Sequence, residues 1–299
     1  MNNLFDGYLV VDWSANSRPK TGKDSIWWCH LSCGNQRHAR IDIRNPPTRL
    51  EAFHQIRSIL YDYKLTQRRI LLGMDFSYGY PQGFAGRLVP GDAQPWKAVW
   101  RYFHEHITDN AANKNNRFEV ATALNRRLTS NKAPFWGCPD SWQSPYLSMR
   151  RPEEALRQGF EEFRIAEQQC SAQSVWKLLY AGAVGSQVFT GLPYLYQLIT
   201  DNLLSEVSRV WPFETGLRAL DSEILQDVIV LHAEIYPSLI EVKASPGEIR
   251  DRLQVQALAH HFARLDETGG LHELFAGLQT LTHTERAIIE QEEGWILGM

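Results

Sequence analysis

The sequence predicts an α/β fold in which a mixed sheet is flanked by helices and interrupted by a helical insertion. Residues 7–14 and 70–77 each begin with a continuous apolar run and end with Asp, an aromatic residue and Ser. Continuous apolar runs are typical of strands that are buried on both faces, as in the parallel part of a helix-covered sheet. Between these two runs, strand-like segments are followed by one amphipathic helix, so strands and helices share a single layered unit.

Three strand-like segments open the chain. Residues 25–32 form a β-rich run with two tryptophans, and Gly34-Asn35 has the composition of a hairpin turn. Residues 37–44 then alternate polar and apolar side chains, as expected of a half-exposed strand. With the strand at 7–14, these segments predict an antiparallel meander.

One helix separates the meander from the fourth strand. Thr48 is a suitable N-cap, and Glu51 completes a capping box for a helix that runs to about Tyr63. The resulting order is three strands, a helix and a strand, with an Asp at the ends of the first and fourth strands. That order is the one expected of an RNase H-like core with a five- or six-stranded sheet.

The chain after the fourth strand departs from a minimal core. Residues 80–146 contain a Gly- and Pro-rich loop, helical stretches at 96–108 and 118–128, and an irregular Pro-rich end. We expect a single domain over residues 1–299, with residues 80–146 as an insertion that covers the strand ends. Further on we expect a helix over 175–198, strands at 208–214 and 228–236, and a helix that begins at Ser245.

Asp12 and Asp75 are the leading candidates for a functional site. Asp is depleted in strands, and sites of α/β proteins lie at the carboxyl ends of the strands. Because side chains alternate along a strand, Asp12 shares a face with Ser14, and Asp75 shares a face with Ser77. If the two strands are parallel neighbours, two carboxylates and two hydroxyls meet at one edge of the sheet.

Composition limits the classes of protein to which the chain can belong. The 299 residues are 43% hydrophobic and 22% charged, with a net charge of −3, so a global basic field for nucleic acid is absent. No apolar run is long enough to cross a membrane, and the first residues do not have the pattern of a signal peptide. The four scattered cysteines favour a reduced, cytoplasmic environment.

Several short motifs resemble an uncharacterised family of predicted RNase H-fold nucleases, domain of unknown function 429. They are Asp-Trp-Ser at 12–14, Asp-Phe-Ser at 75–77, Glu-Ile-Tyr-Pro at 234–237 and the acid-bearing helix that follows. Stretches at 116–121, 134–137, 185–187, 211–214 and 292–295 resemble a bacterial branch of that family. The resemblance covers most of the chain and implies an RNase H fold and nuclease activity. Where the wider family often has a second acid in the last core helix, this chain has Gln254 or Gln256.

Hydrolysis of a phosphodiester with Mg²⁺ or Mn²⁺ requires clustered carboxylates, because these hard cations take oxygen ligands. Asp12 and Asp75 are the expected shared metal ligands, and Asp251 is expected to complete the metal site from its helix. Glu234 is a fourth catalytic candidate, with Glu214 as the alternative from a similar strand end. Six residues are expected to bind the substrate, a nucleic acid or a nucleotide: Ser14, Ser77, Arg117, Lys177, Ser186 and Gln187.

Two other classes remain open from the sequence. A phosphotransferase of the actin–hexokinase type has the same core, but its phosphate loops are rich in Gly, and residues 12–16 contain none. A non-catalytic protein that binds nucleotides or nucleic acid on the same fold is the second alternative. The oligomeric state cannot be deduced from these patterns.

Overall fold

The computed structural model describes residues 3–33, 40–153, 159–170, 173–180 and 183–299; the turn predicted at Gly34-Asn35 lies outside them. Six strands form one mixed sheet in the order β3-β2-β1-β4-β6-β5. β1 pairs antiparallel with β2 and β2 with β3, whereas β4, β6 and β5 continue from β1 in parallel. The strands are β1 (Gly7–Asp12), β2 (Trp27–Ser32), β3 (Arg40–Arg44), β4 (Ile70–Met74), β5 (Ser208–Val210) and β6 (Val230–Glu234).

The helices of the described ranges connect and cover these strands. The longer ones are α1 (Arg49–Leu65), α3 (Pro95–His106), α4 (Arg117–Thr129), α6 (Gly185–Ile199) and α7 (Arg250–Glu267). Shorter ones are α2 (Phe84–Leu88), α5 (Ile165–Gln168), α8 (Leu271–Leu274), α9 (His283–Ile288), and the single turns η1 (Asp140–Trp142), η3 (Pro237–Leu239) and η4 (Ile289–Glu293). The structure thus confirms the predicted α/β class and the mixed sheet.

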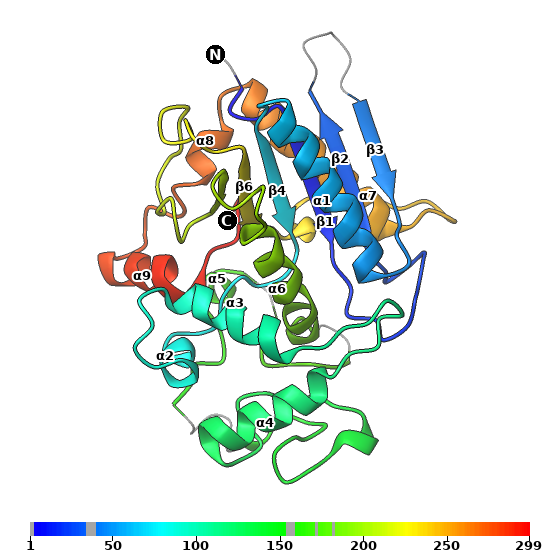
Figure 1. Cartoon of the computed structure of the whole chain (residues 1–299), viewed down its shortest axis with the longest axis vertical. Coiled ribbons are helices and arrows are strands. Elements are labelled where there is room, and N and C mark those ends of the chain that lie inside the picture. Colours follow the sequence, from blue (N-terminus) through cyan, green and yellow to red (C-terminus); the bar gives the residue numbers. More distant parts are fainter. Residues whose placement is uncertain (1–2, 34–39, 154–158, 171–172, 181–182) are drawn as a thin grey trace.

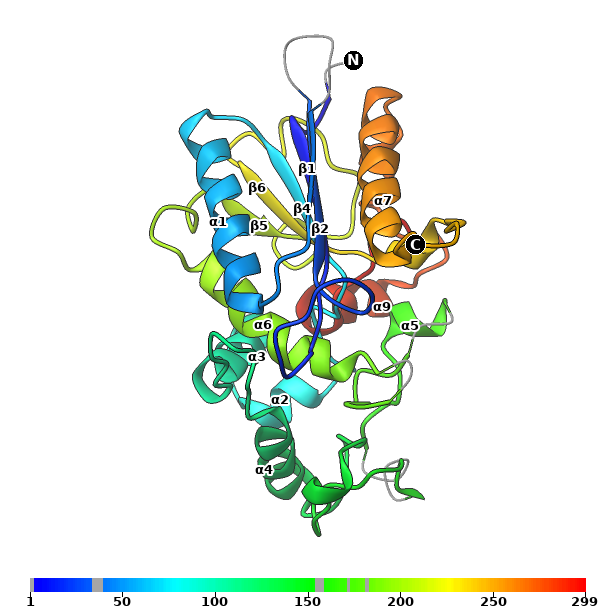
Figure 2. The same cartoon turned by 90° about the vertical axis from the view of Figure 1, so that its right-hand side faces the viewer.

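Helices cover the sheet on both faces, with α1 on one side and α7 on the other (Figure 2). Leu9 and Val11 of β1 face α1 and belong to the larger core cluster, whereas Tyr8 and Val10 face α7 and belong to the second cluster. The strand alternates between two apolar layers, which explains why its sequence is a continuous apolar run. Asp12 follows the same alternation and faces the α7 side.

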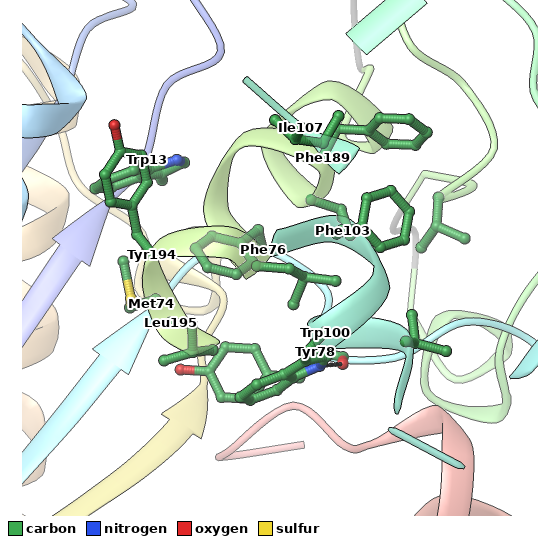
Figure 3. Close-up of a cluster of buried hydrophobic side chains, with 14 of the residues drawn as sticks. Trp13, Met74, Phe76, Tyr78, Trp100, Phe103, Ile107, Phe189, Tyr194 and Leu195 are labelled. Carbon is green, nitrogen blue, oxygen red and sulfur yellow. Dashed lines mark hydrogen bonds between the residues drawn. The ribbon is translucent and has the colours of Figure 1, made fainter. Parts of the chain in front are cut away.

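The insertion predicted at 80–146 contributes α2, α3 and α4, which lie beyond the carboxyl ends of β1 and β4 (Figures 1 and 2). A cluster of buried aromatic rings joins α3 of the insertion, together with α6, to the strand ends (Figure 3). Trp13 and Phe76 lie 6.3 Å apart, Tyr78 packs edge-on against Trp100, and the Trp100 indole N–H donates to the carbonyl of Tyr78. The aromatic residues that follow Asp12 and Asp75 therefore anchor the strand ends to the insertion.

Two helices begin later than the sequence predicts. The helix expected over 175–198 begins only at Gly185, where the backbone of the preceding segment, at the carbonyls of Val175 and Lys177, leaves no room for a Cβ. The helix expected to begin at Ser245 begins at Arg250, because Ser245 and Glu248 close a local turn and Gly247 has a φ of +91°. No helix in the described ranges is long and apolar enough to cross a membrane, and the four cysteines are free thiols.

Candidate functional site

Asp12 and Asp75 are neighbours at the ends of two adjacent parallel strands. In the β1–β4 pairing Val11 lies opposite Met74, so the next position on each chain brings Asp12 beside Asp75. The Asp75 backbone N–H donates to the carbonyl of Val11 at 3.1 Å, and Oδ1 of Asp75 accepts from the N–H of Trp13 at 2.6 Å. These bonds fix the Asp75 carboxyl group against β1, as expected from the repeated Asp-aromatic-Ser pattern.

The two carboxyl groups also interact directly. They lie close enough that each carboxyl group changes the pKa of the other. The pKa of Asp12 is raised to about 7, chiefly because burial disfavours its charge and also because Asp251 and Asp24 lie nearby. Burial and then the charge of Asp12 hold the pKa of Asp75 well above its usual range. Near neutral pH the pair therefore retains a proton.

Asp251 approaches the pair from α7, the helix that covers the face of the sheet on which the two carboxyl groups lie. It lies in the first turn of α7, which packs across β1 and β2, and its Oδ2 accepts from the backbone N–H of Asp24 at 2.7 Å. Its charge raises the pKa of both Asp12 and Asp75. Within the described ranges, however, no group of three or more His, Cys, Asp or Glu side chains is arranged to hold a metal ion. Asp251 thus lies near the pair without closing a three-residue cage around it.

A cleft of about 650 Å³ opens above Asp12. Its walls come from the loop after β1, the loop before β2, the first residue of α4, the segment that leads into α6, and the first turn of α7. The polar and charged residues that line it are Asp12, Ser14, Asn16, Ser17, Asp24, Ser25, Arg117, Tyr180, Ser186, Gln187 and Asp251. The cleft therefore collects four of the six residues predicted to bind substrate and two of the four predicted catalytic acids.

Three of the predicted substrate-binding side chains are engaged with neighbouring groups. Ser14 Oγ accepts from the side-chain amide of Asn16 at 2.7 Å, Gln187 donates to the carbonyl of Trp13 at 2.8 Å, and Ser186 donates to the carbonyl of Leu178. The bond from Gln187 ties the start of α6 to the residue that follows Asp12. These polar groups hold the cleft walls in position while remaining at the cleft surface.

Arg117 and Lys177, the two cations predicted to hold a phosphate, are placed differently. Arg117 is buried, lines the cleft and donates from Nη1 to Ser17 Oγ at 3.0 Å and to Asn115 Oδ1 at 2.8 Å. Lys177 is not among the residues that line the cleft, and its ammonium lies 5.7 Å from the centre of the Trp136 ring. The structure brings Arg117 to the cleft that Asp12 lines but does not bring Lys177 there.

Glu234 does not lie beside Asp12 and Asp75, because it comes one position too early on β6. Glu234 lies opposite Met74, so Ile235 takes the position beside Asp75 and the carboxylate of Glu234 falls on the other face. Its oxygens accept from Arg164 at 2.6 and 2.8 Å and from the N–H of Tyr78 at 2.9 Å. This carboxylate is therefore committed to a buried ion pair.

Ser77 is also directed away from the cleft. β4 ends at Met74, and the chain then turns so that the Ser77 hydroxyl is buried against Glu167 Oε1 at 3.3 Å. The alternative acid, Glu214, accepts from the N–H of Val210 at 2.8 Å and does not line the cleft. Gln254 is buried on α7 and donates to Ser238 Oγ at 3.2 Å. The sequence pattern predicts both hydroxyls and a strand-end Glu beside the pair. That expectation is wrong for Ser77, Glu234 and Glu214.

Sequence reasoning missed Asp24 and Ser17. Both lie in the polar loop between β1 and β2, and they line the cleft because Asp24 is hydrogen-bonded to Asp251 and Ser17 to Arg117. These contacts join residues that are 227 and 100 positions apart. The sequence offers no signal for them beyond the polarity of the loop.

Comparison with known proteins does not identify a relative for this chain. No model of a protein family matches it. The searches of curated proteins and of solved structures found no significant match either. The arrangement of the residues in the cleft is therefore the basis for any statement about function.

Proposed function

We propose that this protein is a divalent-cation-dependent hydrolase of phosphate esters that acts through Asp12 and Asp75, with a nucleic acid or a nucleotide as substrate. The observation that carries the proposal is the pair of carboxyl groups, adjacent at the ends of two parallel strands, with Asp12 at the wall of a cleft. Carboxyl groups forced this close repel each other when both are ionised. A divalent cation relieves that repulsion.

The topology supports an RNase H-like core. The antiparallel β1–β2–β3 meander, the parallel β4 and β6, and an acid-bearing helix packed over β1 follow the expected order. The acids on β1, β4 and that helix come to one end of the sheet. The short β5 is added at the far edge beyond β6, away from the pair.

The donor set suits Mg²⁺ or Mn²⁺. Mg²⁺ is commonly bound through one or two carboxylates together with water molecules and substrate phosphates, without an all-protein cage. Asp12 and Asp75 would hold the ion, and Asp251 would assist from α7, so a three-residue cage in the protein is not required. The four oxygens of the pair are hard ligands, and no sulfur or imidazole competes among the residues that line the cleft.

When bound, a divalent cation would activate a water molecule and neutralise charge on the phosphate. The residues of the chain have separate tasks. The Asp12–Asp75 pair must release its shared proton before it can hold a cation, and the Trp13 N–H keeps one oxygen of Asp75 in place. Arg117, the first residue of α4, supplies positive charge at the wall of the cleft.

Hydrolysis assays test the proposal. Single-stranded and double-stranded DNA and RNA, nucleotides and bis(p-nitrophenyl) phosphate are incubated with the protein and Mn²⁺ or Mg²⁺. We expect hydrolysis of at least one of these phosphate esters that is lost in chelator and lost in Asp75→Asn. Glu273→Gln, which changes an exposed acid on α8, is the matched control and should retain activity. Absence of hydrolysis with every substrate, or full activity in Asp75→Asn, would contradict the proposal.

The shared proton also favours a second candidate. Two carboxyl groups that hold one proton between them can act as a general acid and a general base without a metal, as in aspartic proteases. Activity that persists in excess chelator but is lost in Asp75→Asn would identify this second chemistry. Transfer of phosphate from ATP to an acceptor would instead indicate the phosphotransferase class.

A further inference from the structure

Arg117 differs from the other buried arginines of the described ranges. Three arginines there are buried, namely Arg49, Arg117 and Arg164. Arg49 makes a two-pronged ion pair with Asp109 at 2.6 and 2.7 Å, and Arg164 pairs with Glu167 and Glu234 at 2.6 to 2.8 Å. No carboxylate in the described ranges forms an ion pair with Arg117.

The guanidinium of Arg117 is also incompletely hydrogen-bonded. Arg117 is only 6% exposed, yet its Nε has no hydrogen-bond partner in the part of the chain that the structure describes. The bonds from Nη1 go to the neutral oxygens of Ser17 and Asn115, and one face of the group stacks on the Phe118 ring at 4.4 Å. A buried charge without an opposite charge is costly, so this position favours an anion.

The surroundings of Arg117 do not supply that anion. The charge of Asp109 acts on Arg117, but this carboxylate is already engaged by Arg49, whose own charge repels Arg117. Burial and then Arg49 lower the pKa of Arg117 to about 10, so the group still carries its charge at neutral pH. The unpaired charge lines the same cleft as Asp12.

The N-terminus of α6 lines the cleft as well. Val184, the N-cap, and Ser186 belong to the cleft wall. The N–H groups of Gly185 and Gln187 donate to the carbonyls of Lys177 and Val184, so this end of the helix acts on the cleft through its partial charge and not through those two N–H groups. Helix N-termini carry a partial positive charge that stabilises phosphate groups. Arg117 and the partial charge of the α6 N-terminus thus border a cleft whose other charged residues are the acids Asp12, Asp24 and Asp251.

We propose that Arg117 and the N-terminus of α6 form a binding subsite for a phosphate group of the substrate, separate from the phosphate that Asp12 and Asp75 would act on. The planar fork of a guanidinium suits two oxygens of a phosphate, and a phosphate would supply the charge that Arg117 lacks. This inference rests on the proposed function, and it narrows the substrate to molecules with at least two phosphate groups.

Phosphate binding in the presence of chelator tests the subsite apart from hydrolysis. Inorganic phosphate, a 5′-mononucleotide and a dinucleoside monophosphate are titrated by calorimetry into the wild type and into Arg117→Met. We expect Arg117→Met to weaken phosphate binding by about ten- to a hundredfold, the loss expected for a charge-assisted hydrogen-bonded contact. The mononucleotide reports a terminal phosphate, whereas the dinucleoside monophosphate reports an internal one.

Three further variants keep the result interpretable. Arg126→Met removes an exposed arginine of the same helix, which stacks on Tyr146, and should leave phosphate binding unchanged. Arg117→Lys keeps the charge without the fork and should bind phosphate with intermediate affinity. Asp75→Asn should still bind phosphate, so a failure of the metal proposal would leave this subsite intact. Equal phosphate binding by the wild type and Arg117→Met, or no binding by the wild type, would overturn the inference.

Discussion

Asp12 and Asp75 lie side by side at the ends of two adjacent parallel strands, on the face of the sheet that is covered by α7. Burial raises the pKa of both carboxyl groups, so the pair holds a proton near neutral pH. The pair is therefore sensitive to pH, to substitution of either residue and to any cation that competes with the proton. Each of these sensitivities can be measured.

Asp12→Asn should reduce the pH dependence of stability in the metal-free protein. The pKa of Asp12 is raised to about 7, so the folded protein keeps this proton to a higher pH than the unfolded chain does. The stabilisation is complete below the ordinary pKa of Asp and is lost as pH rises through about 7. Between about pH 5 and pH 8, we expect the free energy of unfolding of the wild type to fall relative to that of the variant. Urea denaturation in chelator measures the difference.

The buried histidines do not affect this comparison. Burial lowers the pKa of His30 to about 4 and of His232 to about 3. The contribution of each histidine to the free energy of unfolding therefore increases as pH rises toward the ordinary pKa of His. Because both histidines are present in the wild type and in Asp12→Asn, their contributions cancel in the difference. Parallel curves for the two proteins across this pH range would show that the pair does not hold a proton.

Asp251→Asn should weaken the site without abolishing it. The charge of Asp251 raises the pKa of Asp12, so its removal should lower that pKa, which carboxyl titration by NMR can detect. We expect the affinity for Mn²⁺ to fall by about tenfold, as is typical when a residue that supports the metal ligands is changed. A variant that loses all binding would instead make Asp251 a ligand equal to Asp12 and Asp75.

Glu234→Gln should act on stability and spare the chemistry. The change weakens the buried pair with Arg164, and breaking such a pair costs about 3 kcal/mol or more. The matched control is Glu214→Gln, which alters an exposed acid in the turn after β5 and should cost about 1 kcal/mol or less. Thermal unfolding and Mn²⁺ titration of the same samples separate the two effects. Loss of Mn²⁺ binding in a folded Glu234→Gln protein would restore Glu234 to the site.

Much of the fold and the central pair could be predicted because local patterns determine them. Apolar runs indicate buried strands, and the repeated Asp-aromatic-Ser pattern places two acids at strand ends. Thr48 is the N-cap, and its hydroxyl accepts from the Glu51 N–H, although the Glu51 carboxylate accepts from Gln55 and does not complete the predicted capping box. Asp12 and Asp75 need only a parallel pairing of the strands in equal register to meet. That pairing is the simplest arrangement of two similar buried strands.

The residues that were misplaced depend on information that a pattern does not contain. Glu234 and Ile235 are adjacent in sequence, and only the β4–β6 register decides which of them faces α7. Ser77 follows the end of β4, where strand alternation no longer applies. Asp24 reaches the cleft through a contact with Asp251, 227 positions away. Register, strand ends and long-range contacts are tertiary properties, so the sequence pattern could not specify them.

Titration of Mn²⁺ by calorimetry is the most direct test of the central claim, because it needs no knowledge of the substrate. Wild-type protein, Asp12→Asn, Asp75→Asn and the control Glu273→Gln are titrated near pH 7.5. The account predicts saturable binding with release of protons in the wild type and in Glu273→Gln, and its loss in both variants of the pair. Unchanged Mn²⁺ binding in Asp12→Asn and Asp75→Asn, or no binding in the wild type, would contradict a metal site at this pair.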